Sequence, residues 1–269
     1  LQNLIDEVLV HTGQHFDNNM SEIFFKEMKI SRPKYNLEIN SLPYAHMIGK
    51  MTDSVLEIIN KEYPEAILVY GDTNSTLSGA IAGLRSKTPV IHIESGLRSF
   101  NRKMPEEINR ILTDHISDLL FCPNENAKKN LNNEGIKNGI QITGDIMYDA
   151  FLFFKKKLKD SVKIKPYVIA TVHRQENTNN LKKLKTIFLE LDKINEKIPV
   201  IIPLHPRTLN VMNENKISTN VSIIKPQGYR DFLSYLLNCS FVITDSGGLQ
   251  KEAFFAKKKC ITVRDQTEW

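Results

Sequence analysis

The chain has 269 residues, of which 41% are hydrophobic and 25% charged, and its formal net charge at neutral pH is +5. This is the composition of a soluble globular protein with one large domain or two domains of ordinary size. Short basic runs such as Lys155–Lys157 and Lys257–Lys259 are typical of solvated helix ends rather than of a nucleic-acid-binding surface. A basic pocket for an anionic ligand is still compatible with this charge.

The cysteines and the apolar runs indicate where the protein resides. Cys122, Cys239 and Cys260 lie far apart in the sequence, each in or beside an apolar run, which favours reduced thiols and a cytoplasmic protein over a disulfide framework. No spacing of Cys and His in the sequence is typical of a structural zinc site, so we expect no metal. No apolar run in it approaches the roughly 20 residues of a membrane-spanning helix, and nothing in it resembles a signal peptide.

Short β-branched runs alternate with longer segments of helical period, which predicts βαβ units and a parallel sheet. Ser41 and Pro43 suit the start of a helix. Its apolar face consists of residues three or four apart, namely Tyr44, Met47, Met51, Val55 and Ile58. The strands predicted in the first half are Val8–Val10, Ala66–Tyr70, Val90–Ile93, Leu119–Cys122 and Gly139–Thr143.

The same alternation begins again in the second half, after a polar segment from Leu152 to Pro166 that lacks a strand. We therefore place a domain boundary near residue 160, with domains 1–160 and 161–269. The expected fold class is α/β, with two Rossmann-like, doubly wound domains facing a cleft. Both ends look cut, so we expect the first strand of domain one and the C-terminal end of domain two to be missing. The elements predicted in domain two are strands Tyr167–Thr171, Val200–Leu204, Phe241–Thr244 and Cys260–Val263 and helices Leu181–Ile198 and Tyr229–Leu237.

Three carboxylates of the first domain are candidates for proton transfer. Asp72 and Glu94 each follow an apolar strand, and Glu106 opens a helix. Each has an ordinary explanation: Asp72 as a helix cap, Glu106 as an acidic first turn after a proline, and Glu94 as a strand-end charge that Arg98 neutralises. Ligands of open α/β sheets bind beyond the carboxyl ends of the strands, so their shared location favours a common site.

The second domain carries residues suited to an anion. In the segment 243–253, a strand passes through Ser246, Gly247 and Gly248 into a helix, whose exposed N–H groups attract phosphate. Glu252, one turn further on, is placed to accept ribose hydroxyls, although a plain glycine turn with a favourable acidic residue is the alternative. Two histidines follow strands and have an arginine close behind, which suits a diphosphate; they are His173 and His205, and His15 repeats the placement more weakly in the first domain.

Together these motifs resemble the non-hydrolysing UDP-N-acetylglucosamine 2-epimerases along the whole chain. Eight motifs stand in order: Gly-Gln-His (13–15), Gly-Asp-Thr-Asn-Ser-Thr (71–76), His-Ile-Glu-Ser-Gly-Leu-Arg (92–98), Pro-Glu-Glu-Ile-Asn-Arg (105–110), Thr-Gly-Asp (143–145), His-Arg-Gln-Glu-Asn (173–177), His-Pro-Arg (205–207) and Thr-Asp-Ser-Gly-Gly-Leu-Gln-Lys-Glu (244–252).

The resemblance implies a glycosyltransferase-B-like fold, a UDP-sugar substrate, no cofactor, and a homodimer that binds neither nucleic acid nor membrane. The implied reaction interconverts UDP-GlcNAc and UDP-ManNAc by elimination and readdition of UDP, for cell-surface polysaccharide precursors. The residues that match the family's catalytic group are Asp72, Glu94, Glu106 and His173. Those that match its UDP contacts are His173, Arg174, His205, Ser246, Gly247, Gly248 and Glu252. Those that match a second, regulatory UDP-sugar site are Gln14, His15, Arg174 and His205.

Some residues depart from the family pattern, and they leave the substrate open. The N-terminal Gly-rich loop of the family is absent from the sequence, Asp145 replaces the more usual Asn, and Glu268-Trp269 stands where Glu-Arg-Pro is common. The Glu-Trp ending looks more like relatives that act on UDP-2,3-diacetamido-2,3-dideoxyglucuronate. Other readings are a glycosyltransferase of the same architecture, a hydrolysing epimerase that releases free ManNAc, and an inactive UDP-sugar sensor. A transferase has no need of three acids around C2, which argues against it.

Overall fold

The computed structural model describes residues 5–13, 30–158, 165–204 and 206–264. The chain divides into two compact units, residues 1–146 and 147–269. This division lies one helix before the boundary expected near residue 160, because the helix that follows residue 146 packs within the second unit. There, the ring of Tyr148 lies 4.9 Å from the ring of Phe255, and the ring of Phe151 lies 5.8 Å from it.

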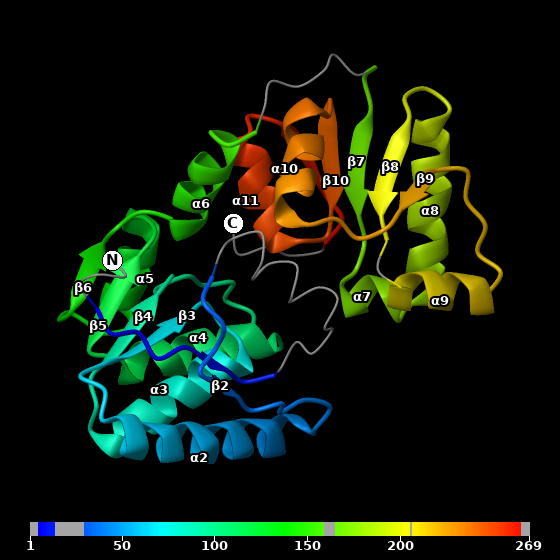
Figure 1. Ribbon diagram of the computed structural model, residues 1–269. Helices are drawn as coiled ribbons and strands as arrows, with labels where there is room; N and C mark the ends of the chain where they lie inside the picture. Colours follow the sequence, from blue (N-terminus) through cyan, green and yellow to red (C-terminus); the bar gives the residue numbers. More distant parts are fainter. Residues whose placement is uncertain (1–4, 14–29, 159–164, 205, 265–269) are drawn as a thin grey trace. The chain divides into compact units, whose positions relative to one another are not determined.

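The first unit contains parallel strands with helices packed on them (Figure 1). A sheet of four strands has the order β3-β4-β5-β6, and β1 pairs with β2 alone. The strands are β1 (Val10–His11), β2 (Tyr35–Asn36), β3 (Ile67–Tyr70), β4 (Val90–Ile93), β5 (Leu119–Cys122) and β6 (Ile140–Ile142). The helices are α2 (Tyr44–Glu62), α3 (Asn74–Ser86), α4 (Pro105–Ile116) and α5 (Glu125–Asn133).

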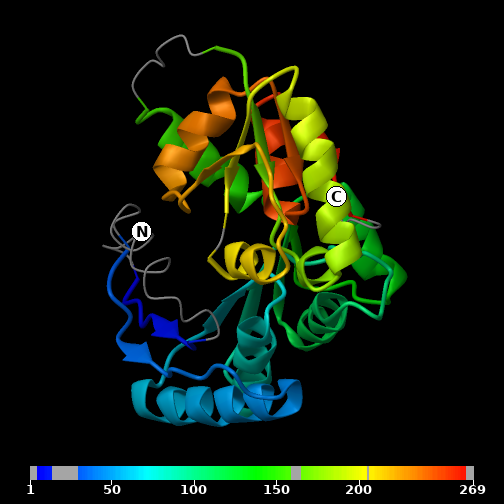
Figure 2. The same cartoon turned by 90° about the vertical axis from the view of Figure 1, so that its right-hand side faces the viewer.

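The second unit is a doubly wound sheet of five parallel strands in the order β11-β10-β7-β8-β9. Figure 2 shows α8 and α10 on opposite sides of this sheet. The chain leaves β7 toward β8 on one side and returns to β10 on the other, so the direction of winding reverses between β7 and β10. The strands are β7 (Val168–Thr171), β8 (Val200–Pro203), β9 (Ser222–Ile224), β10 (Phe241–Thr244) and β11 (Lys259–Thr262). The helices are α6 (Ile146–Lys155), α7 (Gln175–Thr178), α8 (Leu181–Asn195), α9 (Pro206–Glu214), α10 (Tyr229–Asn238) and α11 (Gly247–Phe255).

The apolar residues that predicted these elements form their cores. In α2 the buried residues are Met51, Val55, Ile58 and Ile59, as the helical spacing predicts. In the second unit Val168, Ala170 and Ile202 of the strands pack with Leu184 and Phe188 of α8. Cys122 and Cys239 are buried free thiols, and Cys260 is a partly buried one. No helix among the described residues is long and apolar enough to cross a membrane.

Candidate active site

Asp72 and Glu94 lie close to each other in the first unit. Their strands, β3 and β4, are neighbours in register, with Tyr70 opposite Ile93, so both acids leave the same edge of the sheet. A Cβ atom placed on Gly71 would lie 3.4 Å from Oε2 of Glu94, so the Glu94 carboxylate reaches the residue next to Asp72. Thr73, rather than Asp72, caps α3, in a capping box with Thr76. The Asp72 carboxylate is therefore not used as the helix cap.

Glu106 joins the same region through the first turn of α4. The Tyr44 hydroxyl donates to Oδ1 of Asn109 at 2.5 Å, and Nδ2 of Asn109 donates to the Asp72 carbonyl at 2.9 Å. Burial raises the pKa of Tyr44, the hydrogen bond with Asn109 opposes this shift, and the negative charge of Glu106 adds to it. Glu106 lies three residues before Asn109 and therefore on the same face of α4. Asp72, Glu94 and Glu106 are all partly exposed, as groups that meet a substrate must be.

Arg110 is a functional candidate that the sequence analysis did not single out. Its side chain is 3% exposed, and the guanidinium donates to Oδ2 of Asp72 at 3.2 Å and to Oε2 of Glu107 at 3.1 Å. Glu107 in turn accepts hydrogen bonds from the N–H groups of Ser99 and Phe100. Arg110 therefore fixes the orientation of the Asp72 carboxylate and stabilises its charge. The signal in the sequence is the spacing of Glu107 and Arg110, one helical turn apart in the motif that also contains Glu106.

Glu94 has an unusual backbone, and its expected partner binds elsewhere. Its φ of +73° lies in the left-handed region, which is uncommon for residues other than glycine and is frequent at functional sites. Arg98 was expected to neutralise Glu94. The structure instead directs the Arg98 guanidinium to Asp114 at 2.7 Å and to both carboxylate oxygens of Glu134 at 2.7 Å. Because Arg98 is buried and already holds two carboxylates, that expectation was wrong.

In the second unit, the candidate residues lie where the winding of the sheet reverses, at the carboxyl ends of β7 and β10. Ligands of doubly wound sheets bind at this point. Asp245, which follows β10, is fully buried and accepts hydrogen bonds from the N–H groups of His173 and Arg174 at 3.0 Å and from Nδ2 of Asn177 at 3.0 Å. Nδ1 of His173 lies 3.2 Å from Oδ1 of Asp245, and the imidazole is 50% exposed.

Asp245 therefore holds the loop after β7 against the loop after β10. Burial alone would raise the pKa of Asp245, but hydrogen bonds and charge from His173 and hydrogen bonds from Asn177 and Arg174 outweigh it, so the pKa lies below its usual value. The imidazole donates from Nδ1 to the carboxylate, which leaves Nε2 for a ligand. Asp245 was noted in the sequence only as a neighbour of Ser246, and this role was missed.

Ser246, Gly247 and Gly248 form the start of α11, as predicted. The Ser246 side chain accepts from the Leu249 N–H and caps the helix. Neither glycine has a positive φ, so the alternative of a left-handed glycine turn is wrong, and the glycines keep the helix start free of side chains. Glu252 is 8% exposed; burial raises its pKa, and a hydrogen bond with Tyr229 opposes the shift only in part.

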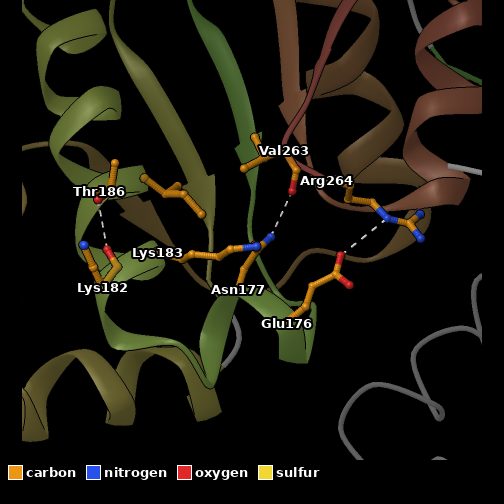
Figure 3. A pocket seen from close by; sticks show the side chains of 8 residues that line it. Glu176, Asn177, Lys182, Lys183, Thr186, Val263 and Arg264 are labelled. Carbon is orange, nitrogen blue, oxygen red and sulfur yellow. Dashed lines mark hydrogen bonds and ion pairs between the residues drawn. The ribbon is translucent and has the colours of Figure 1, made fainter. Parts of the chain in front are cut away.

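A cavity of about 410 Å³ lies beside this loop system (Figure 3). Asn177, which binds Asp245, forms part of its wall and donates to the Val263 carbonyl at 3.0 Å. Arg264, whose side chain is 2% exposed, follows Val263, and its Nε lies 3.7 Å from Oε1 of Glu176. The wall also includes Lys182 and Lys183, so basic residues outnumber the acidic one among its charged side chains.

The structure gathers the predicted residues in two groups. Asp72, Glu94 and Glu106 lie together in the first unit. His173, Arg174, Ser246, Gly247 and Gly248 lie around the point of reversal in the second, with Glu252 one turn into α11. Three predicted contacts, Gln14, His15 and His205, lie outside the described residues, as do Glu268 and Trp269. No group of three or more potential metal ligands is found among the residues that the structure describes.

The fold and these groups define a two-unit, parallel α/β protein with acidic side chains at one strand edge and, at the other, a helix start beside an exposed histidine. A family model described as UDP-N-acetylglucosamine 2-epimerase matches residues 1–269. The UDP-2,3-diacetamido-2,3-dideoxy-D-glucuronate 2-epimerase of Pseudomonas aeruginosa is 47% identical over 275 residues, which cover 100% of this chain and 78% of that protein. The UDP-N-acetylglucosamine 2-epimerase of Methanocaldococcus jannaschii is 42% identical over 284 residues, which cover 98% of this chain and 77% of that protein.

Solved structures agree with the sequence matches. The crystal structure of the M. jannaschii UDP-GlcNAc 2-epimerase in complex with UDP-GlcNAc and UDP has a TM-score of 0.89 and 41% identity, covering 99% of this chain and 78% of that one. The Neisseria meningitidis UDP-GlcNAc 2-epimerase bound to UDP-GlcNAc has a TM-score of 0.88 and 30% identity, covering 99% and 77%. This chain belongs to the UDP-N-acetylglucosamine 2-epimerase family. The expected α/β fold of the glycosyltransferase-B-like type is thereby confirmed.

Proposed function

We propose that this chain inverts C2 of UDP-N-acetylglucosamine without hydrolysis, giving UDP-N-acetylmannosamine. The observation that carries the proposal is the gathering of Asp72, Glu94 and Glu106 in the first unit. Inversion at C2 requires removal of a proton from one face and delivery of a proton to the other, and therefore at least two acid–base groups. Two of the three acids exchange these protons, and the third stabilises charge that develops at C1.

The reaction proceeds in two halves that mirror each other. A carboxylate takes the proton from C2, the electron pair of that C–H bond forms the C1–C2 double bond, and the C1–oxygen bond breaks to release UDP. The product of this half is UDP with 2-acetamidoglucal. In the return half, an acid protonates C2 from the opposite face and the UDP oxygen attacks C1. Atoms and charge balance without any oxidant or metal.

The second unit supplies the UDP contacts in this proposal. The N–H groups at the start of α11 and the exposed imidazole of His173 favour a diphosphate, whose negative charge grows as the C1–oxygen bond breaks. Glu252, with Tyr229 as its neighbour, accepts from the ribose hydroxyls. Arg174 and His205 are proposed as further UDP contacts. With Gln14 and His15 they would form the regulatory UDP-sugar site.

A second candidate substrate is UDP-2,3-diacetamido-2,3-dideoxyglucuronate. The 47% identical relative carries that name, and the ending Glu268-Trp269 favours it too. The chemistry at C2 is the same for both substrates, because both carry an acetamido group at C2 and UDP at C1. The residues discussed above therefore serve either one.

The test is incubation of the protein with each UDP-sugar in deuterated water, followed by proton NMR. We expect the 2-epimer to form with deuterium at C2 and with UDP still attached at equilibrium. The substrate is the UDP-sugar with the higher kcat/KM. Release of free sugar would identify a hydrolysing enzyme, and absence of deuterium exchange with both compounds would refute the epimerase proposal.

A further inference from the structure

A buried histidine and aspartate connect the two loops that carry Asp72 and Glu94. His92 lies in β4 and is 0% exposed, and Asp114 lies in α4 and is 1% exposed. Nδ1 of His92 lies 2.7 Å from Oδ1 of Asp114. Nε2 of His92 lies 2.7 Å from the carbonyl oxygen of Gly71, the residue that precedes Asp72.

Both ring nitrogens of His92 act as donors. The Gly71 carbonyl can only accept, so Nε2 carries a proton. Asp114 accepts two other hydrogen bonds at Oδ2, from the Gly96 N–H at 3.1 Å and from Arg98 at 2.7 Å, which favours the ionised carboxylate. Oδ1 of Asp114 therefore accepts from Nδ1 of His92. Arg98 in turn binds Glu134, so Asp114, Arg98 and Glu134 form a chain of charged groups.

The pair binds the backbone on each side of the candidate acids. On one side it holds the Gly71 carbonyl, next to Asp72. On the other it holds the Gly96 N–H, two residues after Glu94. Both glycines have left-handed backbones, with φ of +65° and +80°, and a Cβ on Gly96 would lie 2.4 Å from the Ala127 carbonyl oxygen. The two loops therefore have little room to shift without breaking these bonds.

We propose that His92 and Asp114 are positioning residues that set the relative placement of the Asp72 and Glu94 carboxylates. Neither touches the substrate; each acts through the backbone of the adjoining loop. Misplacement of a catalytic group by about 1 Å costs on the order of 100-fold in rate. The hydrogen-bonded pair of His92 and Asp114, which we call the brace, therefore governs kcat. This inference rests on the proposed function, in which these two acids act at C2.

The test uses Asp114→Asn and His92→Gln, with Glu134→Gln as the matched control. Glu134 belongs to the same charge chain and its side chain is 26% exposed, but it binds neither loop backbone. We expect kcat of Asp114→Asn to fall about tenfold to hundredfold, with KM for the UDP-sugar and Kd for UDP within twofold of the wild type. His92→Gln, which keeps a donor for Gly71, should lose less, and Glu134→Gln should stay within threefold.

A purely structural role predicts a different pattern, in which the melting temperature falls but kcat per folded molecule does not. That result, or an equal loss in Glu134→Gln, would overturn the proposal. If Asp114→Asn does not fold, His92→Gln decides the question. If the wild-type protein epimerises neither UDP-sugar, the proposed function fails by itself. A crystal structure of the variant then tests the brace, because unchanged positions of Gly71 and Glu94 would refute it.

Discussion

The two units hold polar side chains at the carboxyl ends of parallel strands, but they do so in different ways. In the first unit a helix, α4, turns a polar face inward, and Glu107, Asn109, Arg110 and Asp114 are all buried. Side chains of that face form hydrogen bonds with the loops after β3 and β4. In the second unit one buried carboxylate, Asp245 in the loop after β10, accepts hydrogen bonds from three donors of the segment that follows β7.

This difference matches the chemistry proposed for each unit. The acids of the first unit must keep fixed positions while they exchange protons, which explains why several buried groups orient them together. In the proposed reaction the second unit binds the diphosphate through N–H groups at a helix start and in a loop. A single carboxylate behind the loop is then sufficient to orient them. Variants at the two edges should therefore affect turnover and UDP binding separately.

The largest effect is expected from Glu94→Gln. This change keeps the size of the side chain but removes its capacity to exchange a proton, so kcat should fall by about 10²–10⁴-fold. Epimerisation followed by proton NMR measures the loss, and calorimetry should give a Kd for UDP close to that of the wild type. Glu125→Gln, at an exposed position of α5, is the control and should leave both quantities unchanged. If UDP binding weakens as much as turnover, the proposed division of proton transfer and UDP binding between the two units is wrong.

The sequence predicted the strand-end acids better than the groups that hold them. Asp72, Glu94, His173 and Ser246 could be found because each follows a recognisable apolar strand of a parallel sheet. Arg110 and Asp114 lie in a helix, where a buried polar residue looks the same in a sequence as an exposed one. Asp245 does follow an apolar strand, but the sequence does not show whether a strand-end carboxylate is buried among backbone donors or faces a ligand. The strand β9 and the helix α9 were not predicted. For β9 the reason is that the residues of this edge strand are exposed or only partly buried and lack a full apolar run.

A smaller effect is expected from Asp245→Asn. The amide loses charge-assisted hydrogen bonds worth about 1.5–3 kcal/mol, so Kd for UDP should rise roughly tenfold. The lowered pKa of Asp245 stabilises the fold fully above the usual carboxyl pKa, and this stabilisation is lost as the pH falls through the folded-state value. The stability gap between wild type and variant should therefore shrink below about pH 4, as measured by urea unfolding.

Glu252→Gln is the matched comparison for Asp245, because the pKa of Glu252 is raised by burial instead. A carboxyl group with a raised pKa favours the fold when it is protonated, so ionised Glu252 lowers stability at neutral pH. Glu252→Gln should therefore be more stable than the wild type near pH 7, and the gain should shrink as the pH falls through the raised pKa and vanish below the ordinary carboxyl pKa. The same sign of pH dependence in both variants would contradict these assignments.

The smallest effect concerns the left-handed backbone of Glu94, and the reference is Glu94→Gln, which keeps the strain. A non-glycine residue in this conformation costs about 1–2 kcal/mol, and glycine returns part of that gain through its greater freedom in the unfolded chain. Glu94→Gly should therefore be more stable than Glu94→Gln by about 1 kcal/mol, which raises Tm by roughly 2–4 °C.

Lys87→Gly is the control, because Lys87 is exposed and left-handed at the C-terminal end of α3, with φ of +60°. Lys87→Gly should gain similar stability and keep full activity, whereas Glu94→Gly should remain inactive. A gain at Lys87 without a gain at Glu94 would mean that the loops around Glu94 relieve the strain of its left-handed backbone.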